Sequence, residues 1–505
     1  MRKSLRLSVA SSHLVWEKDG TTAFSGAMTV AKGPEVSLDI SKDDKGLKLN
    51  RLFIEDSTSR AVVSLTLDKH EVGLGFSGKL TGKTVESLVD IKGYSGGWIS
   101  GDFRGDVFLD RPMKFNITGR AAAEGFAIPW KETAPVEIAR LSAYAEGERF
   151  RLDSCDLKWG EDRISLRGDL TSLEKGIFFD MDASAAVIDA GSIEGKLKRI
   201  EKEGEKQKEG DTYVPPARGT VRLRADMLRY SKISLVPLSV EISLDNQGLG
   251  FDVAEANFCG ISLPGRVNIR SGEISLDFRP EAKNGSLEST ISCLSSSFDL
   301  NEYATGTFDL SGKIAGRGTK KDIVRSFKGD IDFIAKEGRI YYEPSVLKIL
   351  AFLEITEIAR GYGDIWRKGL AYNKVVMKCT LSDERIEIVE GFLDSSYMKM
   401  VSQGYVDLAG NKLDVKVLVS PMRTVDRIVE KVPVLGWLLG GTLLSIPVRV
   451  TGDVKDPQVD AFSLSSADSG LLGIMKTTIT LPFKIFTPIL PGKKDGDKKE
   501  RRDAR

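Results

Sequence analysis

The stretch Tyr405-Val-Asp-Leu-Ala-Gly-Asn-Lys-Leu-Asp-Val-Lys-Val-Leu-Val419 alternates apolar and polar side chains. Leu413, Val415, Val417 and Val419 therefore fall on one face of an extended chain, and the polar residues between them fall on the other. The turn sequence Ala-Gly-Asn-Lys joins this strand to the preceding one as a β-hairpin. The stretch predicts an antiparallel sheet with one apolar face.

The same alternation recurs along the chain, together with a repeated glycine. Apolar residues occupy alternate positions at Ile331 and Phe333, and at Ile446, Val448 and Val450. A glycine inside a strand marks a bulge, a bend or a close approach of the neighbouring backbone. Eight units of strand, glycine and second strand contain Gly101, Gly119, Gly168, Gly265, Gly312, Gly329, Gly404 and Gly452. Their repetition predicts a mainly β fold, an elongated antiparallel sheet that curves repeatedly.

A few helices are expected near the C-terminal end, at residues 345–360 and 421–432, where apolar residues recur at helical spacing. The mixed-charge run 195–216 reads as a solvated linker. These features divide the chain into an N-terminal β segment (1–194), the linker, a second β region with the helices (217–465), and an apolar segment with a charged tail (466–505).

Composition argues against several functions. The chain has 505 residues with 73 basic and 72 acidic side chains, so no global positive field would attract nucleic acid. Only two histidines, His13 and His70, are present. Most general-base and zinc-binding schemes depend on histidine. We therefore expect neither an enzyme nor a metal or other cofactor.

The four cysteines, Cys155, Cys259, Cys293 and Cys379, are widely separated and form no C-x-x-C pair. This spacing excludes the common zinc and thioredoxin-like signatures. Buried structural thiols are favoured, and one or two disulfides also fit the pattern.

One stretch resembles a phosphate-binding loop. Residues 73–78 match G-x-G-x-x-G, and Gly82-Lys-Thr follows. A P-loop needs a glycine where this chain has Ser77, and the dinucleotide fingerprint needs a parallel βαβ unit. Nucleotide binding is therefore not expected.

The N-terminus lacks the apolar core of a signal peptide, and no apolar stretch is long enough for a transmembrane helix. Taken alone, these absences predict a soluble chain.

The stretch 306–460 resembles the C-terminal region of AsmA-like proteins, including the YhdP and TamB relatives. The resemblance rests on Gly306-Thr-Phe-Asp-Leu-Ser-Gly312, the predicted helix near residue 350, Pro433-Val-Leu-Gly-Trp-Leu438 and Val450-Thr-Gly-Asp-Val-Lys-Asp-Pro-Gln-Val459. The segment from Thr84 to Phe103 resembles an upstream part of the same family.

The resemblance implies a taco-like β-groove with an apolar interior, placed in the bacterial periplasm or cell envelope and associated with the inner membrane. Its implied partners are phospholipid acyl chains, the membrane surface and other envelope proteins, and its implied role is phospholipid transport and outer-membrane maintenance. The usual N-terminal anchor of the family is absent here, which fits either a truncated gene product or a chain held by a partner. The candidate groove residues are Ile331, Phe333, Leu413, Val415, Val417, Val419, Ile446, Val448 and Val450.

Two other functions stay open on the sequence. The alternating residues could pack a closed core in a β-rich envelope scaffold or adhesin-like protein that has no lipid ligand. A carboxylate-based carbohydrate enzyme on a β-fold is the weaker alternative, because nothing in the sequence selects a pair of carboxylates.

Overall fold

Strands make up most of the computed structural model of the protein, as the period-two alternation predicts. The structure describes residues 7–16, 22–30, 33–44, 46–88, 96–109, 114–128, 136–159, 161–174, 176–192, 217–298, 304–341, 348–349, 368–421, 445–463 and 470–474. These residues form one long sheet that is mainly antiparallel. The chain divides into two compact units. The first comprises 1–302, 307–331 and 381–384, and the second comprises 303–306, 332–380 and 385–505.

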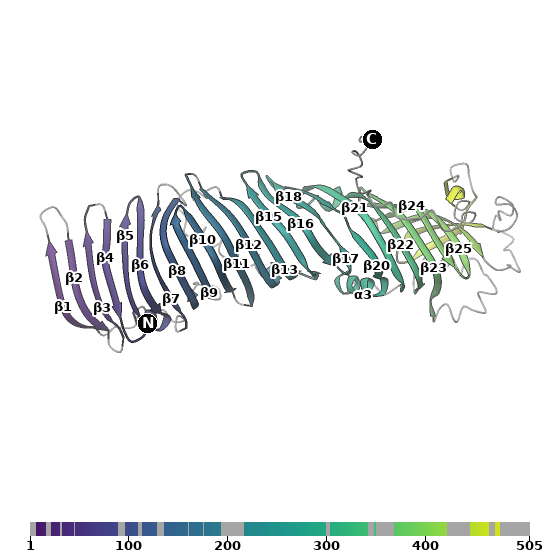
Figure 1. Cartoon of the computed structure of the whole chain (residues 1–505). Coiled ribbons are helices and arrows are strands. Elements are labelled where there is room, and N and C mark those ends of the chain that lie inside the picture. The colour runs from purple at the N-terminus through teal and green to yellow at the C-terminus, as the bar shows by residue number, and fades with distance from the viewer. Residues whose placement is uncertain are drawn as a thin grey trace, which may run out of the picture. The chain divides into compact units, whose positions relative to one another are not determined.

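The first unit begins with hairpins in which each strand pairs with the next. Its first twelve strands are β1 (Leu7–Trp16), β2 (Thr22–Val30), β3 (Glu35–Lys42), β4 (Gly46–Glu55), β5 (Arg60–Asp68), β6 (Glu71–Thr81), β7 (Trp98–Phe108), β8 (Lys114–Ile128), β9 (Val136–Gly147), β10 (Arg149–Trp159), β11 (Asp162–Leu173) and β12 (Gly176–Asp189). Figure 1 shows these strands side by side, from β1 onward. The P-loop-like residues 73–78 lie inside β6, so they form no phosphate-binding loop.

The sheet then continues through a parallel pairing, of β12 with β13. The following strands are β13 (Ala217–Tyr230), β14 (Ile233–Leu235), β15 (Leu238–Asp245), β16 (Gly248–Phe258), β17 (Ile261–Ser262), β18 (Gly265–Arg270), β19 (Glu273–Phe278), β20 (Glu281–Ser286) and β21 (Thr307–Thr319). The predicted linker 195–216 lies outside the described residues. Among these strands, β13 pairs with β15, β16 with β18 and β19 with β21, all antiparallel.

Glycines inside the strands allow the backbone of the neighbouring strand to approach closely, as predicted. Gly119 and Gly168 have φ angles of 122° and 144°. A Cβ atom on Gly119 would lie 2.0 Å from the carbonyl oxygen of Asp102, and one on Gly168 would lie 2.2 Å from that of Asp180. A side chain at either position would clash with the next strand, so only glycine is accommodated.

Helices are not confined to the C-terminal end, so that part of the prediction is wrong. Helix α1 (Gly82–Leu88) follows β6, and α3 (Leu287–Phe298) follows β20; a short 3₁₀ turn, η1, spans Val324–Ser326. Tertiary contacts hold both α-helices, as described below, and such contacts outweigh intrinsic helix propensity. Residues 348–349 are helical. The remainder of the predicted helices, 345–347, 350–360 and 422–432, lies outside the described residues.

The second unit contains the predicted hairpin. Its strands run from β22 (Lys328–Ile340), which starts in the first unit, through β23 (Leu370–Ser382), β24 (Arg385–Ser395), β25 (Met398–Asp407), β26 (Lys412–Pro421) and β27 (Ile446–Asp453) to β28 (Pro457–Ala461). Strands β25 and β26 pair antiparallel from Asp407↔Lys412 to Met398↔Pro421, which confirms the hairpin predicted for residues 405–419.

One face of the strands in the second unit is covered by a helical segment at 470–474. Leu471 is 1% exposed and packs with Val376, Phe392, Val401 and Leu418 in a single apolar cluster. Val401 and Leu418 are fully buried. None of the helices in the described part of the chain has the length and apolar character needed to cross a bilayer.

Candidate functional site: the two faces of the first unit

A single row of directly paired residues crosses the first unit and stays apolar over nearly its whole length. It starts at Ser12 on β1, the only hydroxyl in the row, and ends at Gly318 on β21. Between them lie Gly26, Leu38, Leu52, Val63, Phe76, Phe103, Gly119, Ala145, Phe150, Leu170, Phe179, Gly219, Leu244, Leu249, Ile269 and Ile274. We call this the apolar row, and the surface it belongs to the apolar face. Directly paired residues share a face, so the surface carries no charge along this line.

Neighbouring positions on the apolar face repeat the same character. Met181 pairs with Val221, Val221 with Ile242 and Ile242 with Phe251, so a second apolar line runs beside the first. Near β6, the rings of Phe76 and Phe103 stack with centroids 5.4 Å apart. The apolar character is therefore a property of the face and not of one line.

Most side chains of the apolar face are half-buried rather than enclosed. Leu47, Leu67, Leu74 and Val107 are 39–42% exposed, and Leu249 is 37% exposed. A sheet face packed against a second layer is normally sealed, as at Val401 and Leu418 in the second unit. Extended apolar surface left in contact with water marks a site that binds another apolar body.

From β6 to β21 the opposite face of the strands is polar. Its middle row runs through Ser77, Asp102, Arg120, Tyr144, Arg151, Asp169, Asp180, Thr220, Ser243, Gly250, Asn268, Ser275 and Arg317. We call this surface the polar face. The two faces differ because side chains alternate along each strand, so one pattern of sequence makes both.

Ion pairs between strands organise the polar face. Arg222 lies 2.7 Å from Asp180 and 2.8 Å from Asp182, and Arg317 lies 2.7 Å from Glu273. The hydrogen bond from Arg222 holds the pKa of the Asp182 carboxyl below its ordinary value. These pairs are exposed, so each adds little stability. Their effect is to keep this face hydrated and charged.

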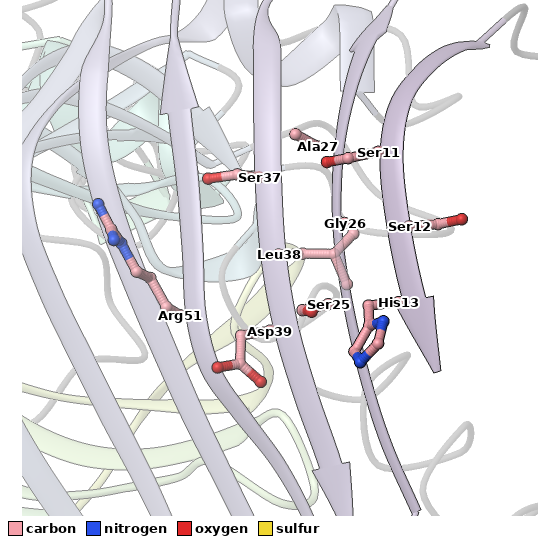
Figure 2. A pocket seen from close by; sticks show the side chains of 10 residues that line it. All are labelled: Ser11, Ser12, His13, Ser25, Gly26, Ala27, Ser37, Leu38, Asp39 and Arg51. Atoms are coloured by element: carbon pink, nitrogen blue, oxygen red, sulfur yellow. The ribbon is translucent and has the colours of Figure 1, made fainter. Parts of the chain in front are cut away.

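Shallow hollows occur on the polar face, and the one on β1–β4 contains a histidine, a serine and a carboxylate. It has a volume of about 530 Å³, and Figure 2 shows His13, Ser25, Asp39 and Arg51 side by side along it. Consecutive strands supply these residues in that order, so Ser25 stands between His13 and Asp39. A nucleophile triad needs the histidine between the serine and the carboxylate. The order of this row is therefore wrong for that chemistry.

Helix α1 packs on the apolar face where β6 ends. Its Val85 and Leu88 contact the cluster of Ile54, Phe76 and Leu80. A buried hydroxyl network fixes its start: Thr84 Oγ1 donates to Asp56 Oδ2 at 2.7 Å and lies 2.6 Å from Ser59 Oγ. Burial acts to raise the pKa of Asp56, but hydrogen bonds from Thr84, Thr58 and Ser59 outweigh burial and hold this pKa below its ordinary value. The hydrogen bonds at the start of α1 therefore favour the ionised form of Asp56.

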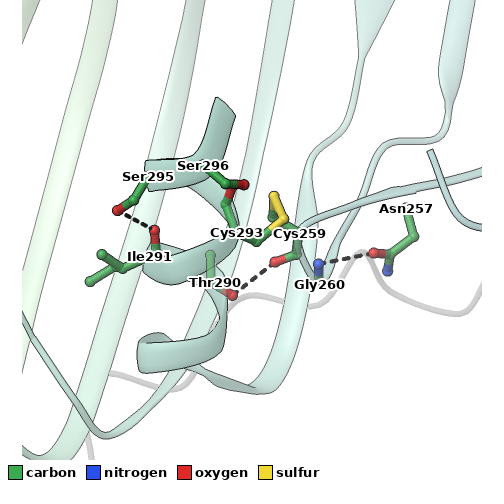
Figure 3. The surroundings of a disulfide bond; sticks show 8 residues. All are labelled: Asn257, Cys259, Gly260, Thr290, Ile291, Cys293, Ser295 and Ser296. Carbon is green, nitrogen blue, oxygen red and sulfur yellow. Dashed lines mark hydrogen bonds between the residues drawn. A yellow bond between two sulfur atoms is a disulfide. The ribbon is translucent and has the colours of Figure 1, made fainter. Parts of the chain in front are cut away.

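A disulfide fixes α3. Cys259 and Cys293 are joined with their Cα atoms 5.5 Å apart, and Thr290 Oγ1 donates to the Cys259 carbonyl at 2.8 Å (Figure 3). The expectation of structural thiols is therefore wrong for this pair, because α3 brings two cysteines together that lie 34 residues apart in sequence. Cys155 and Cys379 remain thiols, and burial raises the pKa of both.

The structure brings together most of the residues proposed from sequence as groove residues. Val415, Val417 and Val419 on β26 pair with Val450, Val448 and Ile446 on β27. These residues and Leu413 share one face.

They lie in a packed interior and not on an open surface. Val419 and Val448 are fully buried, and Val450 and Val417 are 2% and 5% exposed. On β22, Ile331 and Phe333 are half-buried. The exposed apolar surface lies instead on the first unit, in residues that the sequence analysis did not select. These residues also alternate with others along their strands, as Val63, Leu65 and Leu67 do on β5.

The fold and its faces define a class of protein: a long, mainly antiparallel β-sheet with one apolar face and one charged face. No family model, no curated protein and no solved structure matches the chain. Among the described residues, no group of histidine, cysteine or carboxylate side chains could hold a metal ion.

Proposed function

We propose that the chain is a non-enzymatic, AsmA-like protein of the bacterial cell envelope whose apolar face carries phospholipid acyl chains between the inner and outer membranes. The observation that carries this proposal is the uninterrupted apolar row, with half-buried side chains, backed by a charged face. Curvature of the sheet would make the apolar face the interior of a taco-like groove. Acyl chains would lie in this groove and head groups would stay in water at its open edge.

The mechanism needs no catalytic group. Burying a methylene group lowers the free energy by about 0.8 kcal/mol, so an acyl chain is more stable on the apolar face than in water. Strands lie ~4.8 Å apart, and the apolar row from β1 to β21 spans roughly 80 Å along the sheet. Because most strands offer an apolar side chain in this row, a tail moving across the strands would exchange one contact for a similar one. Its free energy stays nearly level along the path.

The disulfide supports the envelope location. Such bonds persist in oxidising compartments, including the bacterial periplasm, and are rare in the cytosol. The Cys259–Cys293 bond closes a loop that holds α3 on the sheet, so its reduction would remove a structural constraint. The proposed partners are the membrane surface and other envelope proteins.

Purification without detergent, followed by lipid extraction and mass spectrometry, tests the proposal. We expect phospholipid to copurify with the chain and to be lost from Leu74→Asp, because Leu74 is a 42% exposed member of the apolar face. Leu408→Asp is the matched control, since Leu408 is 53% exposed and lies in the turn between β25 and β26. Absence of lipid from the unsubstituted chain would instead favour a β-rich scaffold with no lipid ligand.

A further inference from the structure

The first strand of the sheet has an open edge. Strand β1 pairs with β2, and it pairs with no other strand among those described. Figure 1 shows it at the end of the row of strands. The backbone N–H and C=O groups that point away from β2 are therefore available to another strand. Residues 11–15 are all exposed.

This edge lacks the features by which proteins usually protect such strands. Exposed edges are commonly blocked by charged side chains, by proline or by a bulge. Strand β1 reads Leu-Ser-Val-Ala-Ser-Ser-His-Leu-Val-Trp, with no proline and no carboxylate, lysine or arginine. A register shift occurs between Val9 and Ser11, but the pairing is regular from Ser11 to Trp16. Strand β28, by contrast, begins with Pro457 and carries Asp460.

An apolar side chain is also left uncovered at this edge. Leu14 pairs with Phe24, and Phe24 pairs with Ile40, so Leu14 belongs to the apolar face. It is 66% exposed, more than any other large apolar side chain in the described part of the chain. A strand added beside β1 would cover it.

We infer that β1 is an interface at which a second copy of this chain pairs antiparallel, edge to edge. A two-fold axis perpendicular to the sheet relates two antiparallel strands, so both copies present the same face to the same side. A parallel pairing of two copies needs an axis along the strand and would place one apolar face beside the other copy's polar face. The antiparallel arrangement alone makes the two apolar faces continuous.

The chemistry of β1 fits a second copy of itself. Two-fold pairing places each residue of β1 opposite another residue of the same short strand, and a residue on the axis opposite its own copy, so an edge that carried like charges would repel itself. Because β1 carries no such charge, self-pairing meets no repulsion, and the two Leu14 side chains gain cover. This inference does not depend on lipid binding, so either proposal can fail without the other.

Cross-linking and mass measurement on the full chain test the inference. Sedimentation is expected to give twice the mass of the chain at micromolar concentration, and a monomer for Leu14→Lys, which places two ammonium groups near the axis. Leu408→Lys is the control, with its leucine in an exposed turn far along the chain, and it should remain dimeric.

Single cysteines at Ser11, Ser12 and His13 give a readout that does not depend on disrupting the fold. Residues facing each other across antiparallel strands have Cα atoms ~4.5–5.5 Å apart, a distance that a disulfide spans. Covalent dimers should therefore form under mild oxidation at the one or two positions nearest the axis, and not from Leu408→Cys. A monomeric unsubstituted chain, or a dimer that persists in Leu14→Lys and does not cross-link through β1, would overturn the inference.

Discussion

Leu249→Asp places a carboxylate in the middle of the proposed lipid path. Leu249 pairs with Leu244 on one side and with Ile269 on the other, and it is 37% exposed. A tail passing this strand lays about four methylenes over one strand spacing of ~4.8 Å. The carboxylate would hold water at this strand and keep these methylenes from being buried. At about 0.8 kcal/mol for each methylene, the tail would lose roughly 3 kcal/mol of favourable burial free energy at this position.

That loss slows passage by roughly a hundredfold, since about 1.4 kcal/mol corresponds to a factor of ten in rate. The assay is transfer of fluorescent phospholipid between donor and acceptor vesicles. Because Leu249 is partly exposed, the free energy of unfolding should fall by no more than about 1 kcal/mol. Leu408→Asp should transfer at the unsubstituted rate. Equal rates for the two variants, with both folded, would refute the proposed path.

Four further perturbations test the packing that supports this path. Cys259→Ser removes a cross-link between residues 34 apart, and the unfolding free energy measured in urea should drop by about 4 kcal/mol; an unchanged urea midpoint would contradict the structural role of the bond. Thr84→Val leaves the half-buried Asp56 carboxylate and the buried Ser59 hydroxyl short of a partner and should lower the free energy of unfolding by about 2 kcal/mol. Because the folded-state pKa of Asp56 is lowered, its contribution to the free energy of unfolding is present above the unfolded-state pKa and is lost as the pH falls through the folded-state pKa. Asp56→Asn should therefore flatten the acid side of the profile of unfolding free energy against pH. Val417→Asp buries an unpaired charge at a 5% exposed position and should unfold the second unit, seen by circular dichroism; a folded, soluble variant would show that this face is open.

Alternation along the chain predicts the mainly β fold and the strands at 405–419 and 446–450. The hairpin of β25 and β26 follows from the positions of Leu413, Val415 and Val417, and the in-strand glycines at Gly119 and Gly168 mark the close backbone approach that the structure contains. Both inferences are local, because side-chain period and glycine geometry act within one strand and its neighbour.

Other features depend on contacts that are distant in sequence. The parallel pairing of β12 and β13 leaves no signature in alternation. Helix α3 is rich in serine, a weak helix former, and pairing of its Cys293 with Cys259 cannot be deduced from spacing.

The same limit applies to the candidate site. Val417 on β26 and Val63 on β5 have the same alternating pattern, yet one is buried and the other lies on the half-buried apolar face. Whether a face is covered depends on what packs against it, as the segment at Leu471 does on the other side of β26. The pattern therefore predicts apolar faces without indicating which of them stays open.

Photo-cross-linking of a phospholipid with a reactive group at the end of its acyl chain tests the central claim most directly. Peptide mapping should place the adducts on apolar-face residues of the first unit, such as Leu249, Phe251 and Ile269, and none on the polar face at Arg222 or Arg317. Adducts spread equally over both faces, or no adduct at all, would contradict a role for the apolar face in holding lipid tails.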